Sequence, residues 1–303
     1  MCLAVNHRGL LAEVCGSCVT HTWGFLMAKT IGFYQNFRLD IQRLSNALCS
    51  IQQDPEMSHA ALAQCMSVNL PVAEAFSSWL RHTGLVTSVP RKGQQKAIAH
   101  RLSPFGELAY QYDPMLMDTG TQWILHYYLA TRRGEASDAW YILVNNYLPH
   151  HLHFTADQFR SYFSSLMENE AKSRQALDRD PLVALATYIR ADVLGQLQIL
   201  KKQAKMYTVG QPELPPASIL GYMLFDWWQY HYHQTDTLRF SQLRNEEESL
   251  GRICLADASQ IRCFIVELTG LGYLSFSETQ HEPVHRLYRD HPSVLLERYY
   301  TQR

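Results

Sequence analysis

The sequence lacks the features that mark membrane, secreted and disulfide-bonded proteins. No apolar run approaches the roughly 20 residues that a transmembrane helix requires. The N-terminus has neither the basic start nor the continuous apolar region of a signal peptide. The cysteines number 7, an odd count, and their irregular spacing is typical of reduced thiols. We therefore expect a cytoplasmic protein with no membrane partner.

The sequence also lacks a large net charge and known catalytic motifs. The formal net charge is -1, from 27 basic and 28 acidic side chains, so no global field draws the chain to nucleic acid. Any nucleic-acid binding must depend on a local basic patch. The sequence contains no GxSxG, P-loop, HExxH or dinucleotide-binding motif. We expect no enzymatic activity and no cofactor.

Apolar side chains are plentiful and recur at helical spacing. The composition is 47% hydrophobic, which supports folded cores, and 303 residues suffice for two or three domains. Residues 119–147 hold two helix candidates that are apolar nearly all round, separated by a charged turn. Such helices lie inside a domain, so we predict an all-helical core over 104–202. We expect it to bury Trp123, Tyr127, Trp140 and Val144.

Residues 33–103 have the element order of a winged helix-turn-helix. A helix, a short helix, a turn and a third helix are followed by two short strand candidates around a polar turn. The strands and their turn are basic, which suits contact with DNA phosphates. The third helix carries Glu74, and few of its side chains suit base recognition. The candidate DNA-binding residues are Arg91, Lys92, Lys96, His100 and Arg101 on the wing and Asn69, Ser77, Ser78 and Arg81 on the helix.

The C-terminal third repeats this pattern less regularly. Residues 203–216 contain three prolines and a glycine, which predicts a linker. Residues 217–303 begin with an aromatic helix and continue as a second winged-helix-like unit, in which 250–255 resembles a strand. Residues 246–248 are three glutamates, most simply a solvated turn. With a leader over 1–32, we predict a mainly α protein: a helical core flanked by two winged-helix-like units with short β-hairpins.

Several motifs in this order resemble a bacterial family, the domain-of-unknown-function family numbered four thousand and seven (DUF4007). The most specific is DPMLMDTGTQWILH at 113–126. The other segments are 36–39, 79–85, 102–106, Trp140-Tyr141 with Asn145, Phe154-Thr155, the GRICL segment at 251–255 and Tyr299-Tyr300. The resemblance covers about residues 33–300. The chain departs from the family at Ser67-Val68-Asn69-Leu70, where members often have a turn with glycine and lysine.

The resemblance implies an accessory protein of phage-defence or DNA-modification loci, often near phosphorothioation genes, with a DNA-binding role and no established enzymatic activity. Our leading hypothesis is accordingly a DNA-binding accessory or regulatory factor that contacts the backbone of double-stranded DNA through the basic wing. Winged helices also dock onto proteins. The alternative is therefore an adaptor that binds protein partners from the same operon without touching DNA.

Two clusters have the residue types of a metal site but not its spacing. Cys15 and Cys18 form one well-spaced pair, and a structural zinc site usually needs two pairs. His150, His151 and His153 have no local carboxylate or cysteine partner.

We therefore expect no stoichiometric zinc. Metal analysis of protein purified without a polyhistidine tag checks this. One zinc per chain that is lost on Cys15→Ser and Cys18→Ser would contradict the prediction.

Overall fold

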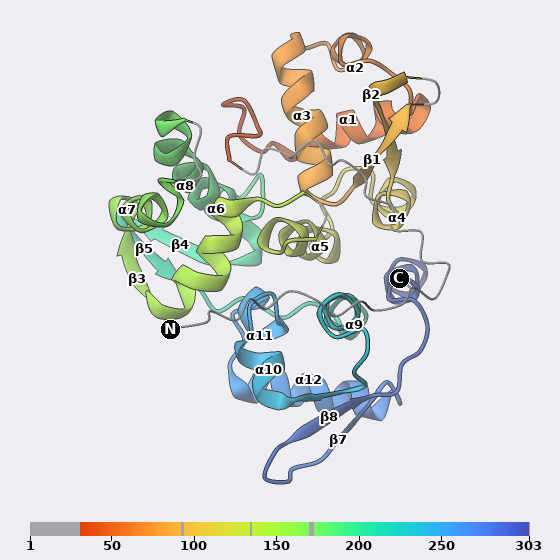
Figure 1. Cartoon of the computed structure of the whole chain (residues 1–303), viewed down its shortest axis with the longest axis vertical. Helices are drawn as coiled ribbons and strands as arrows, with labels where there is room; N and C mark the ends of the chain where they lie inside the picture. The colour runs from red at the N-terminus through yellow and green to blue at the C-terminus, as the bar shows by residue number, and fades with distance from the viewer. Residues whose placement is uncertain (1–30, 92–93, 134, 170–172, 303) are drawn as a thin grey trace, which may run out of the picture.

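A computed structural model describes residues 31–91, 94–133, 135–169 and 173–302, and the leader predicted over 1–32 lies almost wholly outside them. The described chain is mainly helical with small antiparallel sheets (Figure 1). Within these ranges no helix has both the length and the apolar character needed to cross a bilayer.

The first unit, residues 31–102, contains three helices and a hairpin. Each helix begins at a side chain that accepts a hydrogen bond from the first turn: Asp40 from Arg43, Ser58 from Ala61 and Asn69 from Val72. After the third helix, Gly84 has φ +74°, and a Cβ there would lie 2.3 Å from the Tyr128 ring. The elements are α1 (Ile41–Gln53), α2 (His59–Cys65), α3 (Leu70–His82), β1 (Val86–Arg91) and β2 (Gln94–Leu102).

The centre of the molecule is α5 (Thr119–Ala130), which lies between the first unit and the C-terminal elements (Figure 1). The four aromatic and apolar side chains predicted to be core are 0–1% exposed, which confirms the prediction. The second helix candidate is less regular than expected. It is α6 (Asp138–Tyr141), then a π-helix η1 (Ile142–Tyr147) and a 3-10 turn η2 (Leu148–His150). The helix α4 (Pro104–Tyr112) leads into α5.

A three-stranded sheet of order β3-β5-β4 interrupts the core, so the prediction of an all-helical region over 104–202 is wrong. The prediction of a linker over 203–216 is wrong in its first half, because residues 206–209 form β5, the central strand of this sheet. Phe154 stacks on Tyr207 across the strands at 5.5 Å, which buries both rings. The elements are β3 (His153–Thr155), α7 (Ala156–Met167), α8 (Arg174–Ile189), η3 (Gly195–Leu197), β4 (Leu200–Gln203) and β5 (Met206–Val209).

The C-terminal elements form a helical group with a second three-stranded sheet, of order β6-β8-β7. Residues 250–255, predicted as strand-like, are instead a helical turn. Leu250, Ile253 and Cys254 are buried at helical spacing, i, i+3 and i+4, and this period decides the structure. The elements are α9 (Ala217–His231), β6 (Thr237–Arg239), α10 (Phe240–Asn245), α11 (Leu250–Ile253), α12 (Ala258–Gly270), β7 (Leu274–Phe276), β8 (Pro283–Arg286) and α13 (Ser293–Thr301).

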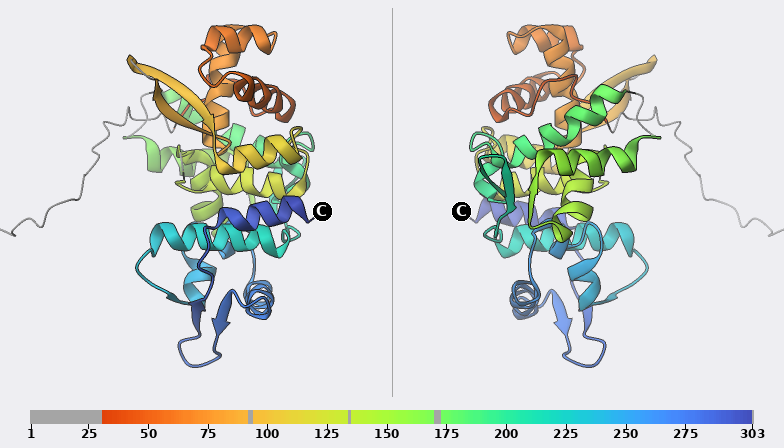
Figure 2. Two further views of the ribbon diagram at one scale, coloured as in Figure 1. Left: turned by 90° about the vertical axis from the view of Figure 1, so that its right-hand side faces the viewer. Right: turned by 90° about the vertical axis from the view of Figure 1, so that its left-hand side faces the viewer.

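The last helix returns to the centre of the molecule. In Figure 2, α13 lies between α4 and α9, and it contacts both. Elements from residues 104–130 and 217–301 therefore share one packed interior.

Replacing Trp123 tests the central position of α5. The indole is fully buried, so Trp123→Ala leaves a large cavity and should lower the free energy of unfolding by about 3–5 kcal/mol. Chemical denaturation measures this. Leu166→Ala, at a side chain that is 49% exposed, is the control and should change it little. A Trp123→Ala protein that unfolds like the wild type would refute the central role of this helix.

Candidate nucleic-acid interface

The β1–β2 hairpin carries most of the predicted DNA-binding residues. Its strands extend from the body of the first unit (Figure 2), and they pair antiparallel from Val86 opposite Leu102. Arg101 is exposed, opposite Thr87. The backbone places Arg91 at the end of β1 and Lys96 in β2, whereas Lys92 lies outside the described residues. Four predicted cationic residues thus belong to this hairpin by position in the chain.

Two of the predicted residues lie beneath the surface. Ser77 on α3 is 0% exposed, and His100 on β2 is 5% exposed. The Ser77 hydroxyl lies 3.0 Å from His100 Nε2 and 3.2 Å from Nε2 of His59, on α2. These contacts fix the hairpin against the helices. Because both side chains are buried, neither Ser77 nor His100 can contact DNA at the surface.

The other predicted residues of α3 are bonded within the protein. Asn69 is exposed, but its side chain accepts a hydrogen bond from the N–H of Val72. Arg81 donates to Glu135 at 2.7 Å and to the Ser78 hydroxyl at 2.9 Å. Recognition of bases needs side-chain donors and acceptors that are not already hydrogen-bonded within the protein. The helix therefore offers little for sequence-specific contact.

A neutral histidine continues this network below Arg81. His82 is 1% exposed, and burial lowers its pKa to about 3. Its Nε2 lies 3.3 Å from the Glu135 carboxylate and its Nδ1 lies 3.0 Å from the Ser137 hydroxyl. A neutral ring can accept a hydrogen bond from the Ser137 hydroxyl at Nδ1. The contacts of Glu135 with Arg81 and His82 tie α3 to the segment before α6.

The three glutamates at 246–248 lie in a turn, as predicted, but the prediction that they are solvated is wrong for Glu248. Glu248 is 3% exposed, accepts hydrogen bonds from the N–H of Arg132 and from His231, and donates its own N–H to Asn145. Glu247 accepts from Tyr141 and Asn146. The charge run alone gave no sign of these partners, because they come from residues 132–146 and 231.

The most specific family motif, 113–126, forms a structural joint. Asp113 accepts the N–H groups of Met117 and Asp118, and Asp118 caps α5. The hydroxyl of Tyr299 donates to Asp118 at 2.9 Å, and that of Tyr300 lies 2.7 Å from the hydroxyl of Thr121. A Cβ at Gly120 would lie 2.4 Å from the Tyr299 ring. The glycine therefore admits the ring, and the motif joins α5 to α13.

The histidine that ends this motif is also structural. His126 is fully buried between Tyr188, whose hydroxyl lies 2.8 Å from Nδ1, and the carbonyl of Ile253, 2.9 Å from Nε2. Burial lowers its pKa to about 4. A neutral ring that donates Nε2–H to the carbonyl and accepts from Tyr188 satisfies both contacts.

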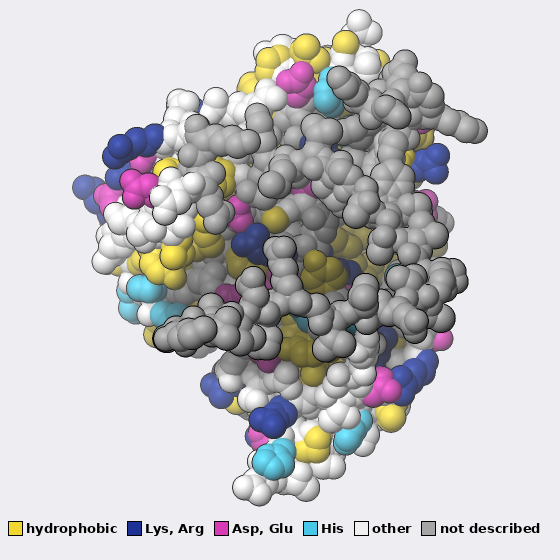
Figure 3. Space-filling view, in the orientation of Figure 1, with side chains coloured by type: hydrophobic (Ala, Val, Ile, Leu, Met, Phe, Trp, Pro, Cys, Tyr) yellow, Lys and Arg dark blue, Asp and Glu magenta, His cyan; other side chains and the backbone are white. Residues whose placement is uncertain are grey.

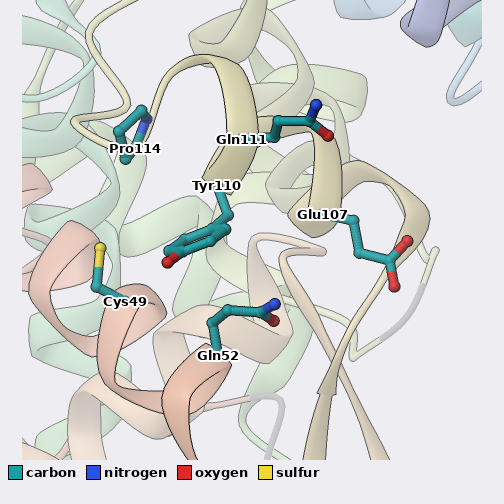
Figure 4. A pocket seen from close by; sticks show the side chains of 6 residues that line it. All are labelled: Cys49, Gln52, Glu107, Tyr110, Gln111 and Pro114. Atoms are coloured by element: carbon teal, nitrogen blue, oxygen red, sulfur yellow. The ribbon is translucent and has the colours of Figure 1, made fainter.

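The surface groove between α1 and α4 offers no evident chemistry. Figure 4 shows its lining residues, Cys49, Gln52, Glu107, Tyr110, Gln111 and Pro114. Burial raises the pKa of the Cys49 thiol, which disfavours the reactive thiolate. Throughout the described ranges no three His, Cys, Asp or Glu side chains gather as metal ligands would. On the face in Figure 3, basic and acidic side chains are interspersed, in keeping with the net charge of -1.

The depressed pKa of His126 predicts a loss of stability in mild acid. Unfolded histidine binds a proton below pH of about 6.5, whereas the folded ring resists protonation down to about 4. Its contribution is complete above the unfolded pKa and is lost as pH falls towards the folded one. Between pH 7 and 5 this group should cost about 2 kcal/mol of unfolding free energy.

Denaturation of wild type and His126→Gln across this range measures the effect. The variant should be less stable at pH 7 and show a flatter dependence on pH. Parallel curves for the two proteins would contradict a neutral buried His126.

Comparison with known proteins places this fold in a family. Two similar solved structures are described as a magnesium ion-bound SspB crystal structure and an SspB crystal structure, with TM-scores of 0.75 and 0.74. Each is 16% identical, and each match covers 90% of this chain and 88% of that chain, which shows a shared fold. A comparison with curated proteins finds no match. The family model for proteins of unknown function (DUF4007) matches residues 34–300, so the chain belongs to that family.

Proposed function

We propose that this protein is a DNA-binding accessory or regulatory factor of a bacterial phage-defence or DNA-modification system. It contacts the backbone of duplex DNA through the β1–β2 hairpin, the wing of a winged helix-turn-helix. The observation that carries the proposal is the order of three capped helices followed by an extended hairpin, on which the sequence places Arg91, Lys92, Lys96 and Arg101. Long cationic side chains on such a hairpin can reach phosphates while they stay hydrated.

The chemistry of α3 favours backbone contact over base recognition. Ser77 is buried, and Arg81 is engaged by Glu135. Glu74 accepts a hydrogen bond from Gln35 and would repel phosphates from the exposed side of the helix. Phosphate contacts carry no sequence information, so the proposed binding is strong at low salt and tolerant of sequence.

Membership of the family supports the biological setting, since the resemblance implies proteins of defence and modification loci. One structure of similar fold contains magnesium. Binding assays therefore include arms with and without Mg²⁺ at matched ionic strength, because a divalent cation also competes for phosphates.

An adaptor role is the second candidate. It is favoured by the net charge of -1 and by exposed apolar side chains in the loop before α5. Met115 and Met117 are each 56% exposed and lie beside Pro114. Exposed methionines are common at protein-binding surfaces because their side chains adapt to a partner.

The replacement of Arg91, Lys92 and Lys96 together by Ala tests the proposed wing. Each phosphate contact releases counterions, so the logarithm of affinity falls with the logarithm of salt concentration by about 0.9 per contact. The triple variant should bind all duplex sequences more weakly, and its salt slope should be smaller by up to about three contacts. Fluorescence anisotropy with labelled duplexes over a salt series measures both.

Replacement of Lys201, Lys202 and Lys205 by Ala is the matched control, because it removes the same charge from the β4–β5 hairpin. It should leave the slope nearly unchanged. If the wing variant keeps the wild-type affinity and slope, the wing is not the contact surface. If the wild type binds no duplex at low salt, the adaptor role becomes the better hypothesis.

A further inference from the structure

A second candidate ligand site lies far along the chain from the wing. It is a groove of about 370 Å³ bordered by residues 148–152, the end of β5 and the segments α10 and α11. We propose that this groove, here called the arginine groove, binds a single nucleotide unit of a nucleic-acid strand, its phosphate held by Arg244 and Arg252. The proposal rests on the proposed function for its choice of nucleic acid as the source of the phosphate.

The cationic side chains of the groove are uncompensated. These are the guanidinium groups of Arg244 and Arg252, and no described lining residue is a carboxylate. Arg244 is exposed and makes no ion pair with any described residue. Two guanidinium groups without a carboxylate between them favour an anion, and their planar forks match phosphate oxygens.

The backbone brings the two arginines close together. A Cβ at Gly251 would lie 2.0 Å from the carbonyl oxygen of Arg244, so only glycine allows α10 and α11 to approach this closely. The Nε of Arg252 donates to the carbonyl of Asn245 at 2.9 Å. That bond fixes one edge of the guanidinium and leaves the terminal amino groups for a ligand. Arg252 is thus held in place before a ligand binds.

Most of the other residues that line the groove are apolar and suit a base or sugar. Leu148, Leu152, Val209 and Leu255 line it, and Leu152 is 65% exposed. Leu255 has φ +51°, a conformation that is unfavourable for this residue type and turns the chain at the edge of the groove. Binding sites for small molecules typically measure about 300–1,000 Å³, so this groove fits one nucleotide and not a duplex.

A phosphate explains the charge better than a carboxylate does. Two guanidinium groups exceed what the single charge of a peptide carboxylate neutralises, whereas the terminal phosphate of a strand carries about −1.5 to −2 charges and offers three acceptor oxygens. A base can also stack on a guanidinium plane or pack against the leucines. The favoured occupant is therefore a strand end that carries a terminal phosphate.

The test uses the thymidine dinucleotide pTpT as the probe, with binding measured by isothermal titration at low salt. The wild type should bind, and inorganic phosphate should compete at high concentration. Arg244→Gln and Arg252→Gln should each weaken binding about tenfold or more, since a hydrogen bond to a charged group contributes about 1.5–3 kcal/mol. Arg239→Gln is the matched control, at an exposed arginine outside the lining.

Arg244 has no ion pair among the described residues, so Arg244→Gln should melt like the wild type and any loss of binding is not unfolding. No binding of pTpT, or equal binding by the wild type and both groove variants, would overturn the proposal. Preferential binding of a leucine-ended peptide with a free carboxylate, lost in Arg244→Gln, would also overturn it in favour of a protein partner.

Duplex binding measured in parallel separates this inference from the proposed function. If pTpT binds as expected but no duplex does, the proposal for the arginine groove is supported and the proposal for the wing is refuted. If duplex binds through the wing while pTpT does not bind, the proposal for the wing is supported and the proposal for the groove is refuted.

Discussion

The architecture depends on a hydrogen-bonded carboxylate at the beginning of the central helix. Asp118 accepts the N–H of Thr121, which starts α5, and the hydroxyl of Tyr299, which holds α13. Because α13 also packs on α4 and α9, this carboxylate lies where the middle and the end of the described chain meet. A charged acceptor strengthens both hydrogen bonds relative to a neutral one. This joint therefore links the beginning of the central helix to the C-terminal elements.

Local sequence predicted the parts of the fold whose causes are local. The order of three helices over residues 33–103 was predicted, and in the structure each of these helices begins at a capping side chain just before an apolar period, Asp40, Ser58 or Asn69. The burial of Trp123 and Trp140 follows from helices that are apolar nearly all round. These elements form by the same rules wherever they occur, so a single sequence suffices to identify them.

The errors arise where distant segments decide the outcome. The strand β5 exists because Tyr207 packs against Phe154, from a segment some fifty residues earlier, and the nearby prolines concealed it. Glu248 is buried because Arg132, Asn145 and His231 converge on it. Of the candidate site, the sequence indicated the position of the cationic hairpin, but burial of Ser77 and His100 depends on how α2, α3 and β2 pack. No local period encodes that packing.

The return of α13 to the centre has a consequence for the order of events during synthesis. The ribosome makes the first unit and α5 long before it makes Tyr299 and Tyr300, the residues that cover the beginning of α5. Contacts that join such distant parts of a chain close late, because loop closure must precede them. The core of the nascent chain therefore stays partly exposed until α13 has been synthesised. A chaperone that shields the exposed aromatic surface of α5 and α9 would have its greatest effect in that interval.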